Sequence, residues 1–253
     1  SFFSAPVIKK IFGAMTIFLL FTSSLLVLAQ SKEDYGDYSD FQNYIPTNLP
    51  DKETTIQQRG LEEQLDKIKK ATLQIGDKDS KRLGTGVIVK KESLDKKNFR
   101  YIIATAYHVI EKLNGEITIY GPKSSEKNNY FYSKNVGVIY EDKKNDLALL
   151  ELIASIPLSV TPIADTLPSS LPVGSKMMMV GFPEEVKENI KVVYGNTVNN
   201  SFTKKLAFNC PTSHGNSGSG VYAFIDGEWQ LVSICVEKFW VSTGGYGVPI
   251  KII

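Results

Sequence analysis

Residues 214–220 read His-Gly-Asn-Ser-Gly-Ser-Gly, and this stretch decides the fold once its partners are found elsewhere in the chain. Three glycines around one serine predict a tight, exposed turn, because glycine adopts positive φ angles and lets the backbone approach a ligand closely. A serine there can meet an electrophile while neighbouring amides point at the same spot. We interpret Ser217 as a candidate nucleophile and the amides of Gly215 and Ser217 as a candidate oxyanion hole. Taken alone, the motif also fits a Gly/Ser-rich hairpin turn.

The base that a nucleophilic serine needs is sought among only two histidines. His214 lies on the same turn as Ser217, where its ring is poorly placed to accept the proton. His108 lies at the end of an apolar run that starts at Tyr101. A strand that delivers a single histidine to its end is a way for a scaffold to position a base. We therefore expect His108 to be the general base.

The carboxylate that orients such a base is predicted at Asp146, directly ahead of the apolar run Leu147–Leu152. A buried acid fixes the tautomer of the base and stabilises the imidazolium that forms. The order along the chain is then His108, Asp146, Ser217. Hydrolases of the α/β type run Ser, Asp, His and subtilisins run Asp, His, Ser, so the order favours the chymotrypsin arrangement.

The chain from Ala71 onward alternates short apolar runs with clusters of Gly, Pro, Asn and Asp. Examples of these runs are GTGVIVKK, YIIATA, DLALLEL and WQLVSICV. The pattern is typical of an all-β antiparallel sandwich or barrel, and no convincing amphipathic helices separate the runs as a parallel α/β protein would require. A double β-barrel would place a cleft between its halves, which is a usual location for a site.

Four motifs in chain order resemble the trypsin-like peptidases: Gly84–Val89, Ile103–Ile110, Asn145–Leu150 and Gly215–Gly220. The likeness is to bacterial HtrA/Deg-type and glutamyl-endopeptidase-like members, without the downstream PDZ domain of the HtrA proteins. The resemblance covers about residues 71–253 and implies two perpendicular six-stranded antiparallel β-barrels with the triad in the cleft. It also implies His108 as general base, Asp146 as its orienting carboxylate and Ser217 as nucleophile.

The resemblance further places a specificity pocket. Trypsin carries an Asp for basic substrates six residues before the nucleophile, and Pro211 stands there, which argues against a basic P1 residue. Glutamyl endopeptidases carry a histidine where Cys235 aligns, which argues against an acidic P1 unless His214 substitutes for it. We expect Pro211, Thr212, His214 and Cys235 to line the pocket, with a small or apolar P1 side chain.

Cys210 and Cys235 both fall beside this inferred pocket. In an exported protein an even pair predicts a disulfide, and two buried free thiols are the alternative. So few cysteines and histidines argue against a structural zinc site. We expect no metal and no organic cofactor, since the triad needs none.

The first 29 residues have the pattern of a secretory signal peptide. Lys9 and Lys10 precede an uncharged, mostly apolar run from Ile11 to Ala29, which closes on small residues. The run is also nearly long enough to span a bilayer, so a retained membrane anchor through residues 11–29 is the alternative. Either reading predicts an exported protein, secreted or in the periplasm or cell envelope.

Residues 30–58 are polar and rich in Tyr and Asp, and cannot bury enough apolar area to fold alone. We read them as a linker or a propeptide ahead of a peptidase domain at residues 59–253. Within that domain, Leu61, Leu65 and Ile68 predict a short amphipathic helix of about three turns.

The formal net charge of +2 gives no reason to expect nucleic acid as a partner.

Taken together, the motifs predict a serine endopeptidase that acts on peptide or protein substrates through an acyl-enzyme. The alternative is a non-catalytic or chaperone-like member of the same fold that retains peptide affinity. The oligomeric state does not follow from the sequence.

Overall fold

The computed structural model describes residues 51–77, 82–113, 117–121, 132–133, 135–163, 171–184, 189–199, 205–238 and 244–249. The expected signal peptide or anchor at residues 1–29 and most of the expected linker at 30–58 lie outside the described residues. Within the described residues, no helix is long and apolar enough to cross a membrane. The chain divides into two units, Ser1–Thr55 and Ile56–Ile253, and the sheets and the site belong to the second.

Helix α2 spans Asp51–Lys70 and is longer than the predicted three turns. It begins at Asp51, so the last residues of the expected linker 30–58 are helical. Leu65 and Ile68 recur at helical spacing, and Ile68 is fully buried in the main core cluster. The apolar face of the helix therefore packs on the peptidase domain, as the sequence pattern predicts.

Among the described residues, seven strands form the first antiparallel sheet. Their order across the sheet is β5 (Tyr132–Ser133), β4 (Thr118–Tyr120), β1 (Thr72–Gly76), β2 (Arg82–Ser93), β3 (Phe99–Thr105), β7 (Leu147–Ala154) and β6 (Val136–Asp142). The pairs Val87↔Ala104 and Ile103↔Leu150 show the register of its centre. All four side chains are fully buried, which explains why these runs read as apolar.

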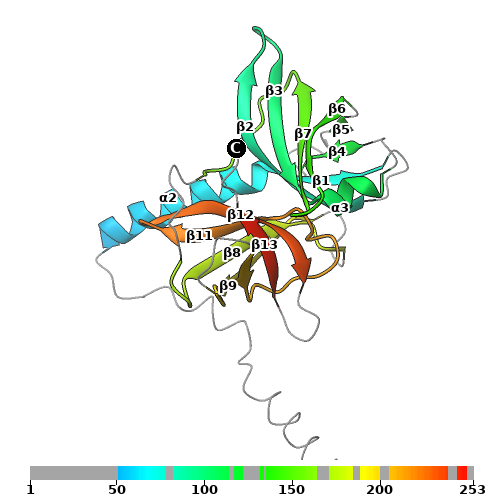
Figure 1. The fold of residues 1–253 in the computed structure, drawn as a ribbon. Helices are drawn as coiled ribbons and strands as arrows, with labels where there is room; N and C mark the ends of the chain where they lie inside the picture. Colours follow the sequence, from blue (N-terminus) through cyan, green and yellow to red (C-terminus); the bar gives the residue numbers. More distant parts are fainter. Residues whose placement is uncertain are drawn as a thin grey trace, which may run out of the picture. The chain divides into compact units, whose positions relative to one another are not determined.

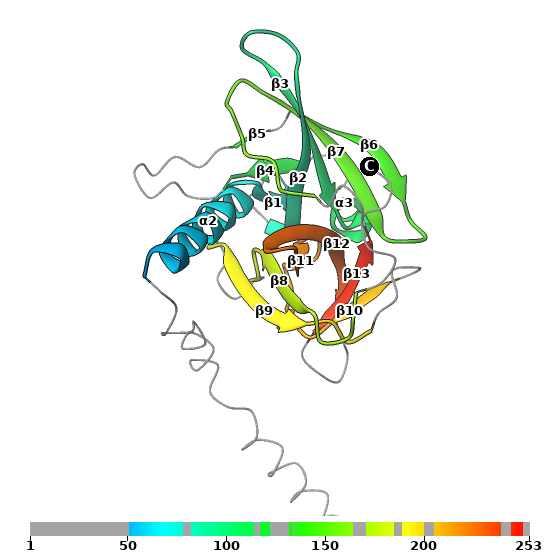
Figure 2. The same cartoon turned by 90° about the vertical axis from the view of Figure 1, so that its left-hand side faces the viewer.

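Six strands of the described chain form the second antiparallel sheet. Their order is β10 (Leu206–Phe208), β13 (Gly245–Pro249), β12 (Glu228–Lys238), β11 (Gly220–Ile225), β8 (Lys176–Gly181) and β9 (Lys191–Asn196). Figure 2 shows this sheet curling round on itself below the first. Its own core cluster includes Met177, Phe208, Val221 and Cys235.

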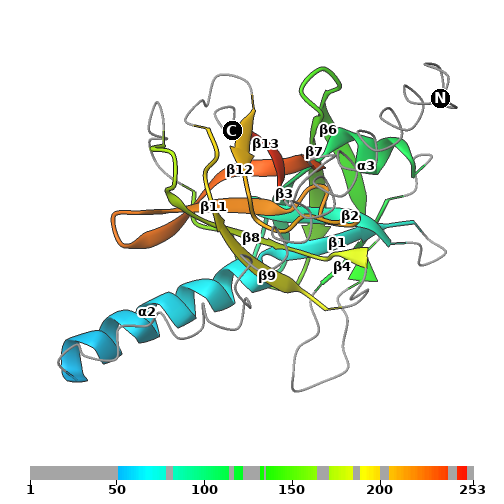
Figure 3. The same cartoon turned by 90° about the horizontal axis from the view of Figure 1, so that it is seen from below.

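The expectation of an all-β fold built from two curled antiparallel sheets is confirmed (Figure 1). Among the described residues the first sheet has a seventh strand, because the two-residue β5 joins its edge. The main core cluster draws on both sheets, with Ile75 and Leu150 from the first and Met178 and Tyr222 from the second. Figure 3 shows α2 running beside β8 and β9 toward β1.

Candidate active site

His108 lies on the short helix α3 (Tyr107–Glu111), three residues after β3 ends at Thr105. The sequence analysis placed His108 at the end of the strand. In the structure the strand ends earlier, and His108 lies in the single helical turn that follows it. Val109 and Ile110 on the same turn are buried. They anchor the helix, while the His108 side chain stays partly exposed at 31%.

Asp146 closes the turn that enters β7, and its φ angle of 59° lies in the left-handed region. Aspartate tolerates this region better than most residues. The turn is held by Asp142, which accepts from the backbone N–H of Asn145 at 3.0 Å and from its side-chain amide at 2.6 Å. These bonds, chiefly the one from the Asn145 side chain, hold the pKa of Asp142 below its ordinary value.

The structure brings the three candidate residues together in one hydrogen-bonded chain. His108 Nδ1 lies 2.7 Å from Asp146 Oδ2, and His108 Nε2 lies 2.8 Å from Ser217 Oγ. The backbone N–H of His108 donates to Asp146 Oδ1 at 2.8 Å. This is the geometry in which a carboxylate orients an imidazole and the imidazole accepts a proton from a serine.

The nucleophile turn, residues 213–219, contains a tight β-turn at residues 216–219. Ser219 N–H donates to the Asn216 carbonyl at 2.9 Å, and Gly218 occupies the third position with a φ angle of 87°. A type II turn needs a positive φ there, which glycine supplies without steric cost. Ser217 thus sits at the second position of the turn, where its Oγ faces His108.

Gly215 also has a positive φ, of 86°, and the backbone after β8 packs against it. A Cβ atom at this position would overlap the Phe182 carbonyl and lie 2.8 Å from the Glu184 nitrogen. Glu184 N–H donates to the His214 carbonyl at 2.7 Å. Within the described residues, no carbonyl accepts from the amide of Gly215 or of Ser217. Both amides are therefore available to a ligand.

The expected pocket residues differ in how far they are exposed. Pro211 and Thr212 are half-buried, and the Thr212 hydroxyl donates to the Cys210 carbonyl at 2.8 Å. His214 is exposed, and its Nε2 lies 3.4 Å from Lys238 Nζ. Cys235 is 1% exposed and packs in the core cluster of the second sheet.

The backbone of Cys235 supports the nucleophile turn. Gly218 N–H donates to the Cys235 carbonyl at 2.7 Å, and Cys235 N–H donates to the Ser219 carbonyl at 2.9 Å. Both Cys210 and Cys235 are free thiols, so the structure has two buried free thiols at this pair and no disulfide between them. Burial raises the pKa of each thiol to about 12.

Sequence reasoning did not assign a role to Thr85, which the structure places against the nucleophile turn. Its hydroxyl donates to the Gly215 carbonyl at 2.9 Å, and its backbone N–H donates to the Ser217 carbonyl at 2.8 Å. The signal was available in the Gly-Thr-Gly stretch at residues 84–86. Only the fold, however, brings that stretch next to residues 215–217.

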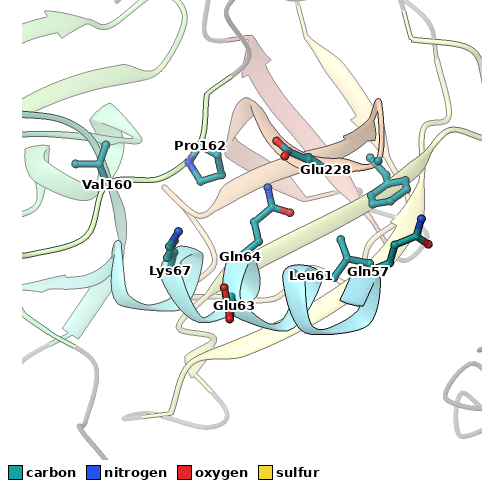
Figure 4. Close-up of a pocket in the computed structure, with 11 residues that line it drawn as sticks. Gln57, Leu61, Glu63, Gln64, Lys67, Val160, Pro162 and Glu228 are labelled. Carbon is teal, nitrogen blue, oxygen red and sulfur yellow. The ribbon is translucent and has the colours of Figure 1, made fainter. Parts of the chain in front are cut away.

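A separate groove of about 630 Å³ lies between α2 and the β11–β12 hairpin, away from the triad (Figure 4). Gln64 points from α2 toward the strand that carries Glu228. Its side-chain amide donates to the Trp229 carbonyl at 3.1 Å and accepts from the Trp229 N–H at 3.0 Å. None of the triad residues lines this groove.

In the part of the chain that the structure describes, no group of three or more His, Cys, Asp or Glu side chains could hold a metal ion. The candidate site consists of the triad, the turn amides and the residues that support them.

Comparisons with known proteins bear on the family and the fold. The family profile of the trypsin-like peptidase domain matches residues 84–234. No curated protein matches the sequence. The structure resembles the serine endoprotease from Yersinia pestis, with 21% identity and a TM-score of 0.57 over 74% of this chain and 61% of that one. It also resembles Deg5, with 18% identity and a TM-score of 0.56 over 80% of this chain and 91% of that one.

At these identities the two structural likenesses show the fold, and the chain spans less than two thirds of the Yersinia pestis protein. The family match covers more than half of the chain and includes His108, Asp146 and Ser217. The chain therefore belongs to the family of trypsin-like peptidase domains.

Proposed function

We propose that the protein is a serine endopeptidase that hydrolyses peptide bonds through an acyl-enzyme intermediate. Ser217 is the nucleophile, His108 the general base and Asp146 the carboxylate that orients it. The observation that carries the proposal is the unbroken chain from Asp146 Oδ2 through the His108 ring to Ser217 Oγ, with steps of 2.7 and 2.8 Å.

The geometry supports the following sequence of steps. Ser217 Oγ attacks the carbonyl carbon of the scissile bond while His108 Nε2 takes its proton. The N–H groups of Gly215 and Ser217 stabilise the oxyanion that forms. His108 then gives the proton to the leaving amine, and the acyl-enzyme remains on Ser217. His108 then takes a proton from a water molecule, which attacks the ester carbonyl carbon; the bond from that carbon to Ser217 Oγ breaks, His108 returns the proton to Oγ, and the second product leaves as a carboxylic acid.

A fluorophosphonate probe tests the proposal directly, because it reacts with an activated serine and needs no known substrate. We expect the full chain to be labelled and Ser217→Ala to remain unlabelled. Ser155→Ala, which removes an exposed serine directly after β7 ends at Ala154, serves as the matched control and keeps its labelling. A wild-type chain that is not labelled, or labelling that survives Ser217→Ala, would favour a non-catalytic peptide-binding protein instead.

For the substrate, we propose a small or apolar P1 residue. The 3.4 Å contact between Lys238 Nζ and His214 Nε2 supports the exclusion of basic side chains, because it holds a positive charge next to the nucleophile turn. Cleavage of a peptide library, read by mass spectrometry, is expected to show Ala, Val or Leu at P1. A profile dominated by Lys, Arg or Glu would contradict this specificity and leave the proposed chemistry intact.

A further inference from the structure

We propose that Thr85 is a positioning residue for the oxyanion hole, acting from β2 of the first sheet on the nucleophile turn of the second. The inference rests on the proposed function, since it concerns how the Gly215 amide is held for catalysis. Thr85 touches neither His108 nor Asp146 in the hydrogen bonds of the structure, and it acts through the turn alone.

The Thr85 hydroxyl is a relay between two backbone segments. It donates to the Gly215 carbonyl at 2.9 Å and accepts from the Phe182 N–H at 3.0 Å. Thr85 is fully buried, so water cannot replace either bond. The hydroxyl has one proton to donate, and that proton is committed to Gly215.

The backbone of Thr85 fixes the same turn at a second point. Its N–H donates to the Ser217 carbonyl at 2.8 Å, and its carbonyl accepts from the Thr105 hydroxyl at 2.7 Å. The turn also lies directly on β2, because a Cβ atom at Gly218 would overlap the Thr85 carbonyl and the Thr105 hydroxyl. Thr85 thus holds the carbonyls of both residues whose amides form the proposed oxyanion hole.

The hydrogen bonds to these carbonyls matter because a glycine has no side chain to restrict its own backbone conformation. Gly215 can adopt many backbone conformations, and its φ of 86° is one among them. Glu184 N–H holds the His214 carbonyl, and a trans peptide directs its N–H opposite to its C=O. The Gly215 N–H therefore points away from Glu184. The Thr85 hydroxyl fixes the next peptide, so neither plane beside the Gly215 Cα can rotate.

The test compares Thr85→Val, which keeps the side-chain shape and removes the hydroxyl, with Thr85→Ser, which keeps the hydroxyl. The readouts are the second-order rate of fluorophosphonate labelling and the kcat and KM for dye-labelled casein. We expect Thr85→Val to label about 10- to 100-fold more slowly, somewhat less than the loss of a whole oxyanion donor. We expect kcat to fall in parallel, with KM changed by less than about twofold.

Two further readouts separate positioning from a general loss of structure. The pH at which labelling is half-maximal stays the same in Thr85→Val, because the bonds of His108 are untouched. Thr161→Val is the matched control, since Thr161 is another buried threonine whose hydroxyl lies 2.8 Å from Tyr222 OH. It is expected to lose stability without losing labelling rate. Thr85→Ser is expected to recover the wild-type rate within about threefold.

The inference is overturned if Thr85→Val labels at the wild-type rate, or if Thr85→Ser is as slow as Thr85→Val. Equal losses in Thr161→Val would also overturn it. If Thr85→Val does not fold, Thr85→Ala carries the same expectation, since it removes the hydroxyl without placing a methyl group against the Phe182 N–H. A wild-type chain that does not label at all would refute the proposed function, whereas these outcomes concern Thr85 only.

Discussion

The two carboxylate oxygens of Asp146 hold the same residue in two ways: Oδ1 accepts from the backbone N–H of His108 at 2.8 Å, and Oδ2 lies 2.7 Å from its ring Nδ1. Asp146→Asn is expected to slow fluorophosphonate labelling about 10⁴-fold, because an amide in this place favours the wrong tautomer of the ring. The melting temperature should change little, since asparagine also tolerates the φ of 59°.

Asp226 provides the control for that substitution. It is the other non-glycine residue with a positive φ in the described chain, at 52°, and it lies on the β11–β12 hairpin turn. Asp226→Asn is expected to label at the wild-type rate. Equal slowing in both variants would mean that the turn conformation, and not the hydrogen bond to His108, sets the rate.

The depressed pKa of Asp142 predicts a pH-dependent contribution to stability. A carboxylate whose pKa is lower in the folded chain stabilises it above the unfolded value of about 3.8, and this contribution disappears as the pH falls through the folded value. Asp142→Asn should therefore lower the melting temperature by about 1–2 °C near neutral pH. The difference from wild type should vanish in acid.

Asp95 offers a matched comparison for the acid dependence, because it accepts from Lys97 N–H, Asn98 N–H and the Asn98 side chain, which lower its pKa too. Asp95→Asn should show the same pH pattern. Only Asp142→Asn should also slow labelling, since Asp142 holds the turn that presents Asp146. A difference in melting temperature that persists at low pH would refute the assignment.

The buried cysteines should be unreactive in the folded protein. With the pKa of each thiol near 12, almost no thiolate is present at neutral pH, and neither sulfur is accessible. A colorimetric thiol reagent is expected to detect no thiol in the native chain and two in denaturant, without prior reduction. Two thiols that appear only after reduction would show that Cys210 and Cys235 form a disulfide.

Gln64 should be sensitive to a change that preserves its shape. Its amide both donates to and accepts from the backbone of Trp229, and Gln64→Glu would set a carboxylate oxygen against the Trp229 carbonyl. We expect a loss of about 1–3 kcal/mol in the free energy of unfolding, measured by denaturant titration. Glu63→Gln, at an exposed neighbouring position, should change it by less than about 0.5 kcal/mol. Equal effects would contradict the role given to the amide.

Much of the fold could be predicted because buried strand positions are occupied by apolar residues, which the sequence shows directly. The run Leu147–Leu152 is mostly apolar where β7 lies between β3 and β6 in the first sheet, and the glycines around Ser217 mark a turn that needs positive φ. The scarcity of histidine left two candidates for the base, and the place of His214 on the same turn as Ser217 then favoured His108. The six strands of each barrel were implied by the resemblance, and among the described residues the two-residue β5 adds a seventh strand to the first sheet.

The supporting residues of the site could not be predicted in the same way. Thr85 and Gly215 are 130 positions apart, and a threonine in an apolar strand gives no indication of what its hydroxyl will meet. The same holds for Gln64, which bonds to Trp229 across 165 positions. These contacts depend on how the elements pack in three dimensions, and the local sequence does not show which distant residues will lie in contact.

The hydrogen bonds between Gln64 and Trp229 have a consequence for the association of one molecule of this protein with another. Strand β12 begins at Glu228, yet β13 pairs only with the part from Ser233 to Lys238. The first half would present an open edge, the kind of edge on which strands of other chains add and aggregation begins. The Gln64 amide occupies the groups of Trp229, and the Pro162 carbonyl takes the N–H of Leu231 at 2.9 Å. Helix α2 and the segment around Pro162 therefore cover this part of the edge. Because the backbone groups of Trp229 and the N–H of Leu231 are already hydrogen-bonded, they cannot pair with a strand of another molecule, and this opposes aggregation.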